Sequence, residues 1–388
     1  MTFRRSFLIT FFLSLGLVVA FAAGYYAHDL RPPVPDLPIL SRAYEILLTQ
    51  GWKEVPETKS LEYGMIRGMI QAYDDPYTIF VEPVAHELES DSLQGSFGGI
   101  GVQLSYDDQG YIVFFPFPES AARKAGIQDG DRLLAVEDWQ VPLHTTIEDV
   151  QSAIRGPVGQ ALSMTIGHPP DFEPVTVRVR REQIPLPSVT WHLDLEEPQV
   201  GIIDINLIAA STVEEIQKAV LSLEEQGATL FVLDLRDNPG GLLTAGVDIA
   251  RLFLREGVVI EQQYRGQEPE SFQVDHPGPL AEIPLVVLIN HGSASAAEIV
   301  AGALQAHQRA KLVGEPSFGK DTIQLVFDLP DNSSIHITAA HWWVPGLQQP
   351  VGEGGLQPDI PVPPSETGSG PDTALQAAVQ ALLERSDP

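Results

Sequence analysis

VGIIDINL (200–207) is the first of three near-continuous apolar runs in this chain. The second run is TLFVLDLR (229–236) and the third is IPLVVLIN (283–290). Helical patterns follow the three runs in turn, at 211–227, 244–257 and 296–307. Further strand patterns, expected to be antiparallel, lie at 324–329 and 334–343. Strands buried on both faces read as continuous apolar runs, and alternation with helices is typical of a mostly parallel sheet, so the sequence predicts an α/β core.

A second folded region is expected before this core. It opens with GSFGGIGVQL (95–104) and continues as short strand patterns with two short helical ones, enough for one compact domain. Helical patterns precede it, and a tail rich in Ser, Gly and Pro follows the core before a last short helix. The chain is therefore expected to be multidomain, with the following parts: a helical N-terminal segment (29–92), the strand-rich domain (93–182), the α/β core (183–365), and a linker with a C-terminal helix (366–388).

The amino end carries an uncharged apolar run, Ser6 to Ala27, directly after Arg4 and Arg5. As a helix these 22 residues would extend about 33 Å, enough to cross a hydrocarbon core of roughly 30 Å. The two arginines favour the cytoplasmic side, which predicts a single-pass cell-membrane protein whose remaining chain is extracytoplasmic. The stretch 20–22 reads A-x-A, as at a signal-peptide cleavage site, so residues 1–28 are a membrane anchor or, alternatively, the cleaved signal of a secreted protein.

Composition excludes several classes of function. The 388 residues include 23 Lys plus Arg against 52 Asp plus Glu, a formal charge of −29, which argues against a nucleic-acid partner. An apolar fraction of 44% excludes wholesale disorder. The chain has no cysteine, which excludes disulfides, thiolate metal sites and a Cys nucleophile. Neither HExxH, nor a P-loop, nor G-x-G-x-x-G is present, so we expect no metal and no cofactor.

A candidate nucleophile follows the third apolar run, in HGSASAAEIVAGAL (291–304). Gly292 permits a sharp turn, and Ser295 then stands at the start of the next helix, at the carboxyl edge of the sheet where α/β sites form. Unpaired N–H groups and the positive helix end lie beside such a hydroxyl. The alternative is a plain S-x-x-E capping box formed with Glu298.

A serine nucleophile needs a base. Histidines occur in the same domain, but there is no G-x-S-x-G elbow to pair one with Ser295. Lys320, in PSFGKDTIQ (316–324), is the other candidate. It acts as a base only when neutral, so burial must lower its pKa, and Phe318 and Ile323 are the expected apolar shell. The alternative is a solvated loop lysine.

A third feature is DLRDNPGG (234–241), at the end of the second apolar run. Adjacent glycines between a strand and a helix can direct backbone N–H groups at an anion. A tight turn without function explains Gly240 and Gly241 equally well.

These motifs together resemble the carboxyl-terminal processing peptidases, or tail-specific proteases, which are Ser–Lys endopeptidases. The stretches that carry the resemblance, in chain order, are DDPYTIFVEP (74–83), FGGIGVQL (97–104), AGIQDGD (125–131), DLRDNPGG (234–241), SASAAEIVAGALQ (293–305), GEPSFGKDTIQ (314–324) and GGLQPDIPV (354–362). The resemblance implies a ClpP/crotonase-like core with a mostly parallel sheet and an inserted PDZ domain. It also implies protein substrates held by a free C-terminus.

The resemblance implies a role for each matching residue. Ser295 is similar to the acylated serine, Lys320 to the general base, and Gln324 to the glutamine that positions the lysine. The N–H of Ala296, with that of Gly240 or Gly241, is expected to form the oxyanion hole. The peptide-binding residues of the PDZ domain are expected to be Gly99, Ile100, Gly101 and Val102.

Two departures from the family pattern stand near these residues. Ala297 replaces a usual serine, and Asp321 replaces a usual glycine beside Lys320. Because a carboxylate opposes a neutral base, we expect Asp321 to point to solvent. The alternatives to a Ser–Lys peptidase are a proteolytically silent PDZ scaffold and a Ser–His hydrolase that uses His291 or His341. Whether the chain forms a homo-oligomer is left open.

Overall fold

The computed structural model describes residues 37–363 and 371–386. The chain divides into two compact units, one ending at Gly68 and one beginning at Met69. The expected membrane anchor or signal peptide, 1–28, lies outside the described residues. Within the described ranges, no helix is both long and apolar enough to cross a membrane.

Two helices occupy the start of the described chain. Helix α2 (Pro38–Gln50) has proline at its first position, where the missing N–H is not needed. Helix α3 (Thr58–Tyr73) begins in the first unit and ends in the second, and Tyr63 is its buried residue. Both lie where the sequence predicts a helical lead-in.

The strand-rich region forms an antiparallel sheet with two short helices. Its elements are β3 (Val102–Tyr106), β4 (Ile112–Pro116), α5 (Ala121–Lys124), β5 (Asp131–Val136), β6 (Trp139–Gln140), α6 (Ile147–Ile154), β7 (Ala161–Gly167) and β8 (Pro174–Arg180). The strand order is β3-β4-β5-β7-β8, with β6 paired to β5, so β3 is an edge strand. Alternate residues such as Phe114, Leu133 and Met164 fill a core of their own. A two-stranded ribbon of β2 (Ser96–Gly99) and β9 (Glu182–Pro185) connects this region to the rest of the second unit.

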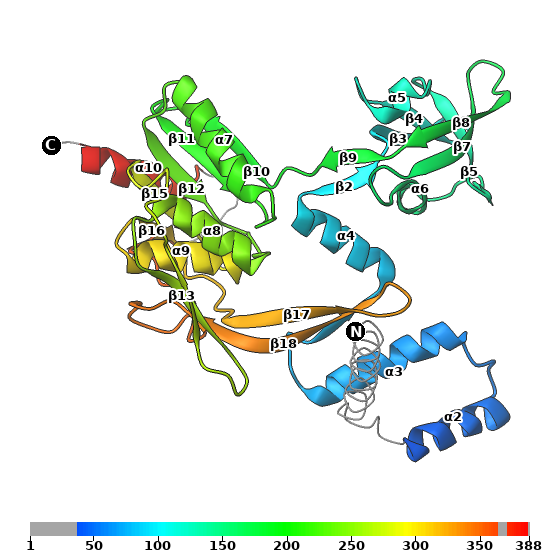
Figure 1. The fold of residues 1–388 in the computed structure, drawn as a ribbon, viewed down its shortest axis with the longest axis horizontal. Coiled ribbons are helices and arrows are strands. Elements are labelled where there is room, and N and C mark those ends of the chain that lie inside the picture. The colour runs from blue at the N-terminus through cyan, green and yellow to red at the C-terminus, as the bar shows by residue number, and fades with distance from the viewer. Residues whose placement is uncertain (1–36, 364–370, 387–388) are drawn as a thin grey trace, which may run out of the picture. The chain divides into compact units, whose positions relative to one another are not determined.

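The three apolar runs form the centre of a six-stranded sheet (Figure 1). Its strands, in spatial order, are β10 (Val189–Leu193), β11 (Val200–Ile205), β12 (Leu230–Asp234), β15 (Leu285–Ile289), β16 (Lys311–Gly314) and β19 (Ile360–Pro361). All neighbours are parallel except β10 and β11. The expected mostly parallel α/β sheet is therefore present.

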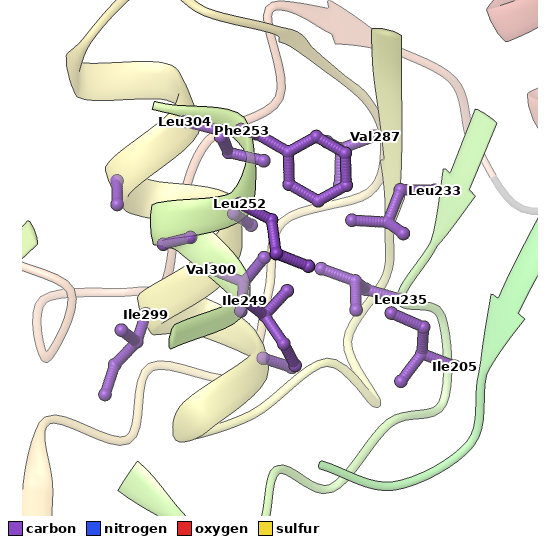
Figure 2. Close-up of a cluster of buried hydrophobic side chains, with 14 of the residues drawn as sticks. Ile205, Leu233, Leu235, Ile249, Leu252, Phe253, Val287, Ile299, Val300 and Leu304 are labelled. Atoms are coloured by element: carbon purple, nitrogen blue, oxygen red, sulfur yellow. The ribbon is translucent and has the colours of Figure 1, made fainter. Parts of the chain in front are cut away.

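Helices cover both faces of this sheet. They are α7 (Thr212–Glu225), α8 (Leu243–Phe253), α9 (Ala296–Ala306) and α10 (Thr373–Ser386). Figure 2 shows α8 and α9 packed through Phe253 and Leu304 against strand residues such as Leu233. Because side chains alternate along a strand, Val232 faces the other way, into the cluster that α10 completes. Burial on both faces explains why these strands carry few polar residues.

A second, antiparallel sheet lies beside the core helices. Its strands are β1 (Ile79–Val81), β18 (Ser334–Trp343), β13 (Val258–Tyr264), β14 (Glu270–Gln273) and β17 (Thr322–Asp328), and α4 (Pro83–Gln94) follows β1. β17 and β18 form the antiparallel pair expected at 324–343. The sequence did not signal β13 and β14.

Candidate active site

Ser295 lies in the turn between β15 and α9, with φ 54° and ψ −117°. A non-glycine residue in this region of backbone space is strained, typically by about 1–3 kcal/mol, and such strain gathers at functional sites. The turn requires glycine at position 292, because a Cβ there would lie 2.7 Å from the Cα of Asp237. The strand, turn and helix thus present Ser295 at the carboxyl edge of the sheet.

The loop after β12 is bound to the loop after β15. The Asn290 Oδ1 accepts the Asp237 N–H at 2.9 Å, and the Asn290 Nδ2 donates to the Asp237 carboxylate at 3.0 Å. The Ala294 N–H donates to the Asn238 carbonyl at 2.9 Å. These bonds hold the DLRDNPGG and HGSAS segments together.

Glu298 connects the backbone at Ser295 with the backbone at Lys320. Its fully buried carboxylate accepts the Ser295 N–H at 2.8 Å, the Gly319 N–H at 2.7 Å and the Lys320 N–H at 2.9 Å. The Ser317 hydroxyl donates to it at 2.5 Å. Burial raises the pKa of Glu298, and these hydrogen bonds only partly offset that rise. The S-x-x-E pattern therefore does more than cap a helix, a role that sequence reasoning missed.

Lys320 has two partners that orient its amine. Its Nζ donates to Oε1 of Gln324 at 2.8 Å and lies 5.1 Å from the ring centroid of Tyr77. The Gln324 side-chain amide in turn donates to the Tyr77 carbonyl. Tyr77 was not singled out from the sequence, although it stands within the DDPYTIFVEP motif. Phe318, expected in the shell of Lys320, is exposed and packs on His291 instead, with ring centroids 5.6 Å apart.

The pKa of Lys320 is lowered by its surroundings. Burial is the largest cause, and the charges of Glu89, Asp75 and Glu298 oppose it without reversing it. Asp321, the next residue along the chain, has a different neighbour. Its side chain is 36% exposed and lies 3.6 Å from the His341 imidazole. A neutral amine, which a general base requires, is therefore favoured relative to a solvated lysine.

Ser295 and Lys320 line the same cavity, which has a volume of about 520 Å³. Gln324, Gly240 and Gly241 line it as well. Much of the remaining wall is apolar: Leu93, Leu207, Leu242, Leu243, Ile299, Ile323, Val326 and Trp342. Within the described ranges, no hydrogen bond joins the Ser295 hydroxyl to the Lys320 amine. Catalytic hydrogen bonds often tighten only once substrate is bound.

The two glycines at the cavity differ. The Gly240 N–H donates to Oδ1 of Asn238 at 2.8 Å. A Cβ on Gly240 would lie 2.9 Å from the Ser295 Cβ and 3.0 Å from the Ala296 nitrogen, so this position needs glycine for close approach. The N–H groups of Gly241 and Ala296 have no hydrogen-bond partner among the residues that the structure describes. Of the two glycines, Gly241 is thus the one whose N–H is free for a ligand.

The glycine-rich loop before β3 lines a narrow groove of about 80 Å³, together with Ile154 and Arg155. The carbonyls of Ile100 and Gly101 accept bonds from the Ala122 N–H at 2.9 Å and the Phe117 N–H at 3.0 Å. In the described part of the chain, the N–H groups of these two loop residues have no partner. Gly99 and Val102 also line the groove, whereas Ile100 is 1% exposed and belongs mainly to the core.

Comparison with known proteins identifies the family. A family model described as Peptidase family S41 matches residues 199–362, and a PDZ domain model matches residues 118–166. A carboxyl-terminal-processing protease of Picosynechococcus sp. is 37% identical over 336 residues, covering 84% of this chain and 80% of that protein. The chain belongs to the carboxyl-terminal processing proteases of peptidase family S41.

Other carboxyl-terminal processing proteases are nearly as similar. One from Synechocystis sp. is 36% identical, covering 82% of this chain and 76% of the relative. A solved structure named photosystem II D1 C-terminal processing protease is 29% identical, covers 84% of this chain and 87% of that one, and superposes with a TM-score of 0.46. The predictions of family, serine peptidase activity and PDZ domain are confirmed.

The histidines expected for a Ser–His hydrolase do not line the cavity of this protease. His291 is exposed and contacts the Phe318 ring, and His341 is 66% exposed beside Asp321. The histidine that does line the cavity is His336, and it contacts the Ser334 hydroxyl at 3.1 Å. The geometry gives Ser295 no histidine partner among the described residues.

Proposed function

We propose that Ser295 is the acylated nucleophile of this carboxyl-terminal processing protease and that Lys320 is its general base. The observation that carries the proposal is that both residues line one cavity, while the Glu298 carboxylate holds both backbone segments. The lowered pKa of Lys320 and its hydrogen bond to Gln324 support the role of base and of positioning residue.

The reaction is acyl transfer to serine. The Ser295 oxygen attacks a peptide carbonyl while its proton passes to the Lys320 nitrogen. Lys320 then gives this proton to the leaving amine as the peptide bond breaks. A water molecule then attacks the acyl carbonyl while its proton passes to the Lys320 nitrogen. Lys320 gives this proton to the Ser295 oxygen as the ester bond breaks, which regenerates the serine.

We assign the oxyanion hole to the N–H groups of Gly241 and Ala296. Both are free of other partners in the described chain, whereas the Gly240 N–H is bonded to Asn238. Such donors typically contribute about 2.7–4 kcal/mol each to the transition state. Gly240 serves by leaving room beside Ser295.

Substrate capture is assigned to the PDZ domain, over residues 93–182. The free N–H groups of Ile100 and Gly101 suit a terminal carboxylate, and the open edge of β3, which begins at Val102, suits pairing with an extended peptide. Gly99 lies close to the Phe97 ring, since a Cβ there would be 2.8 Å from it. The substrate class is therefore a protein with an unstructured, free C-terminus.

The remaining assignments rest on the sequence. We propose a membrane anchor or signal at 1–28, a helical segment at 29–92, a protease core at 183–365 and a linker with a C-terminal helix at 366–388. The catalytic part is then extracytoplasmic, held at the membrane or secreted. Homo-oligomer formation stays a prediction, to be tested by the mass of the full chain in solution.

The test is cleavage of a protein with a flexible C-terminal tail by the full chain and its variants. Ser295→Ala and Lys320→Ala are expected to abolish cleavage, whereas Lys311→Ala, at an exposed lysine, keeps it. Equal cleavage by the wild type and both site variants would overturn the assignment. Three equally inert proteins that still bind a free-carboxylate peptide would instead establish a silent scaffold.

A further inference from the structure

Helix α10 docks firmly on the core sheet, on the face opposite α8 and α9. Ala378 and Leu382 are fully buried, and they pack in one cluster with Ile202, Val232 and Leu288 from three neighbouring strands. The helix contacts β12, β15 and β16. The C-terminal helix thus packs against the sheet of the protease core, although it lies beyond the residues matched by the peptidase family model.

Asp372, directly before α10, links this helix to the strand end that precedes the catalytic loop. Its Oδ1 accepts the Leu375 N–H at 3.0 Å, which caps the helix, and also Nη1 of Arg236 at 3.0 Å. Its Oδ2 lies 2.8 Å from Nη2 of the same arginine. Burial alone would raise the pKa of Asp372, but the hydrogen bonds from Arg236 and Leu375 outweigh it, and the pKa lies below its ordinary value.

Arg236 stands between two carboxylates. Besides Asp372 it binds Asp234, with Nε 3.0 Å from Oδ1 and Nη2 2.6 Å from Oδ2. Burial disfavours the charged guanidinium, but the hydrogen bonds to both carboxylates raise its pKa above the ordinary value. The side chain is therefore fixed from two sides, by the end of β12 and by the start of α10.

The chain runs from Arg236 straight into the loop of the active site. Asn238, two residues on, is fully buried, donates to the Ile205 carbonyl at 2.7 Å and accepts the Gly240 N–H at 2.8 Å. Gly241 follows, and a Cβ there would lie 2.1 Å from the Ile208 carbonyl oxygen. Arg236 and Gly241, the proposed oxyanion donor, are five residues apart. Because the loop between them is tightly packed, a displacement of Arg236 must be accommodated within this short segment.

We propose that Asp372 is a positioning residue for the peptidase reaction: from the C-terminal helix it holds Arg236, and through Arg236 it holds the Gly241 N–H in place. The inference rests on the proposed roles of Ser295 and Gly241. Asp372 does not line the cavity of Ser295 and Lys320, so its contribution is to the rate of the chemical step and not to peptide capture.

Asp372→Asn isolates the ion pair from the cap. Asparagine caps a helix about as well as aspartate, so the variant keeps the bond from Leu375 while removing the charge that fixes Arg236. We expect kcat to fall roughly three- to tenfold with KM nearly unchanged, since small misplacements of catalytic groups cost rate. In an Arg236→Met background, which removes the cation, the same substitution has little further effect, because the two residues act as one unit.

Ala381→Gly is the matched control on the same helix. It lowers helix stability by about 1 kcal/mol but leaves Asp372 untouched, so it is expected to lower Tm at least as much as Asp372→Asn while keeping kcat. An unchanged kcat in Asp372→Asn, a loss confined to KM, or an equal loss in Ala381→Gly would overturn the inference.

Every variant is made in the full chain, and its cleavage of one protein substrate with a flexible tail is measured. Ser295→Ala is measured alongside. If the wild type cleaves, Ser295→Ala does not, and Asp372→Asn equals the wild type, only the role of Asp372 fails. If the wild type and Ser295→Ala cleave equally, the proposed dyad fails and the inference fails with it.

Discussion

The cavity lined by Ser295 and Lys320 and the groove lined by the glycine-rich loop before β3 share one feature in different settings. Each presents backbone N–H groups without partners in the described chain, from Gly241 and Ala296 in the cavity and from Ile100 and Gly101 in the groove. In the cavity a strained serine and a half-buried lysine stand beside them. Arg155, the charged residue lining the groove, is already paired with Asp91 at 3.2 Å. Backbone donors alone can bind an oxygen of the substrate. Catalysis also requires a nucleophile and a neutral amine that acts as its base.

Removing the proposed nucleophile or base tests whether the cavity and the groove act separately. Ser295→Ala or Lys320→Ala is expected to lower kcat by roughly 10⁴-fold or more, as for other serine peptidases. Binding of a free-carboxylate peptide is expected to be unchanged, because the groove is intact. Fluorescence anisotropy beside a cleavage assay measures both. A parallel loss of peptide binding would show that the two sites are not separate.

A smaller effect is expected from adding a side chain to the loop of the proposed oxyanion donor, Gly241. Gly240→Ala places a methyl group 2.9 Å from the Ser295 Cβ, and kcat should fall by roughly 10²–10³-fold, as when an oxyanion donor is lost. Gly227→Ala is the matched control, since both glycines have φ of 102° but position 227 has nothing within 4 Å of the added Cβ. Equal losses in both variants would attribute the effect to backbone strain and not to the site.

Crowding the PDZ loop is expected to act on substrate capture. In Gly101→Ala the added Cβ would lie 2.6 Å from the Ser120 Cβ, which displaces the loop N–H groups. Loss of a hydrogen bond to a carboxylate should raise KM roughly tenfold for tailed proteins while kcat stays near wild type. Gly126→Ala, also at positive φ but in open space, is the control. A fall in kcat with KM unchanged would contradict the division of labour between the sites.

The smallest expected effect is a shift in pH dependence. Activity should rise with pH as the Lys320 ammonium loses its proton, over a range below the ordinary lysine pKa. The Glu89 carboxylate raises this pKa, so Glu89→Gln should move the acid limb of the kcat/KM profile to lower pH. Asp321→Asn should leave the limb in place. A shift to higher pH in Glu89→Gln, or an equal shift in Asp321→Asn, would contradict the electrostatic account.

Much of the fold could be read from the sequence because its central strands are buried on both faces. The runs at 200–207, 229–236 and 283–290 contain β11, β12 and β15. The helices between these strands, α7 and α8, lie where apolar residues recur with helical spacing. β13 carries the polar residues Glu261, Gln262 and Gln263, so it lacks the apolar run that marks the central strands.

The site was predictable where its contacts are local, and less so where they are distant. The bond between Asn238 and Gly240 spans two residues and is an Asx-type turn, so the choice of Gly241 as donor was available from the sequence. The Gln324 bond to Tyr77 joins residues 247 apart, and no periodicity reports such a contact. The ion pair of Arg236 with Asp372 spans 136 residues and was missed for the same reason.

The proposed mechanism depends on the protonation state of Lys320, and lysine NMR measures this state directly. The chain has six lysines, so a ¹³C-lysine-labelled full chain gives few signals, and Lys320→Arg assigns the one of interest. We expect that signal to titrate below the ordinary value of 10.5, ahead of the exposed lysines. If it titrated together with them, Lys320 would stay charged at neutral pH, and the proposed base for Ser295 would be lost.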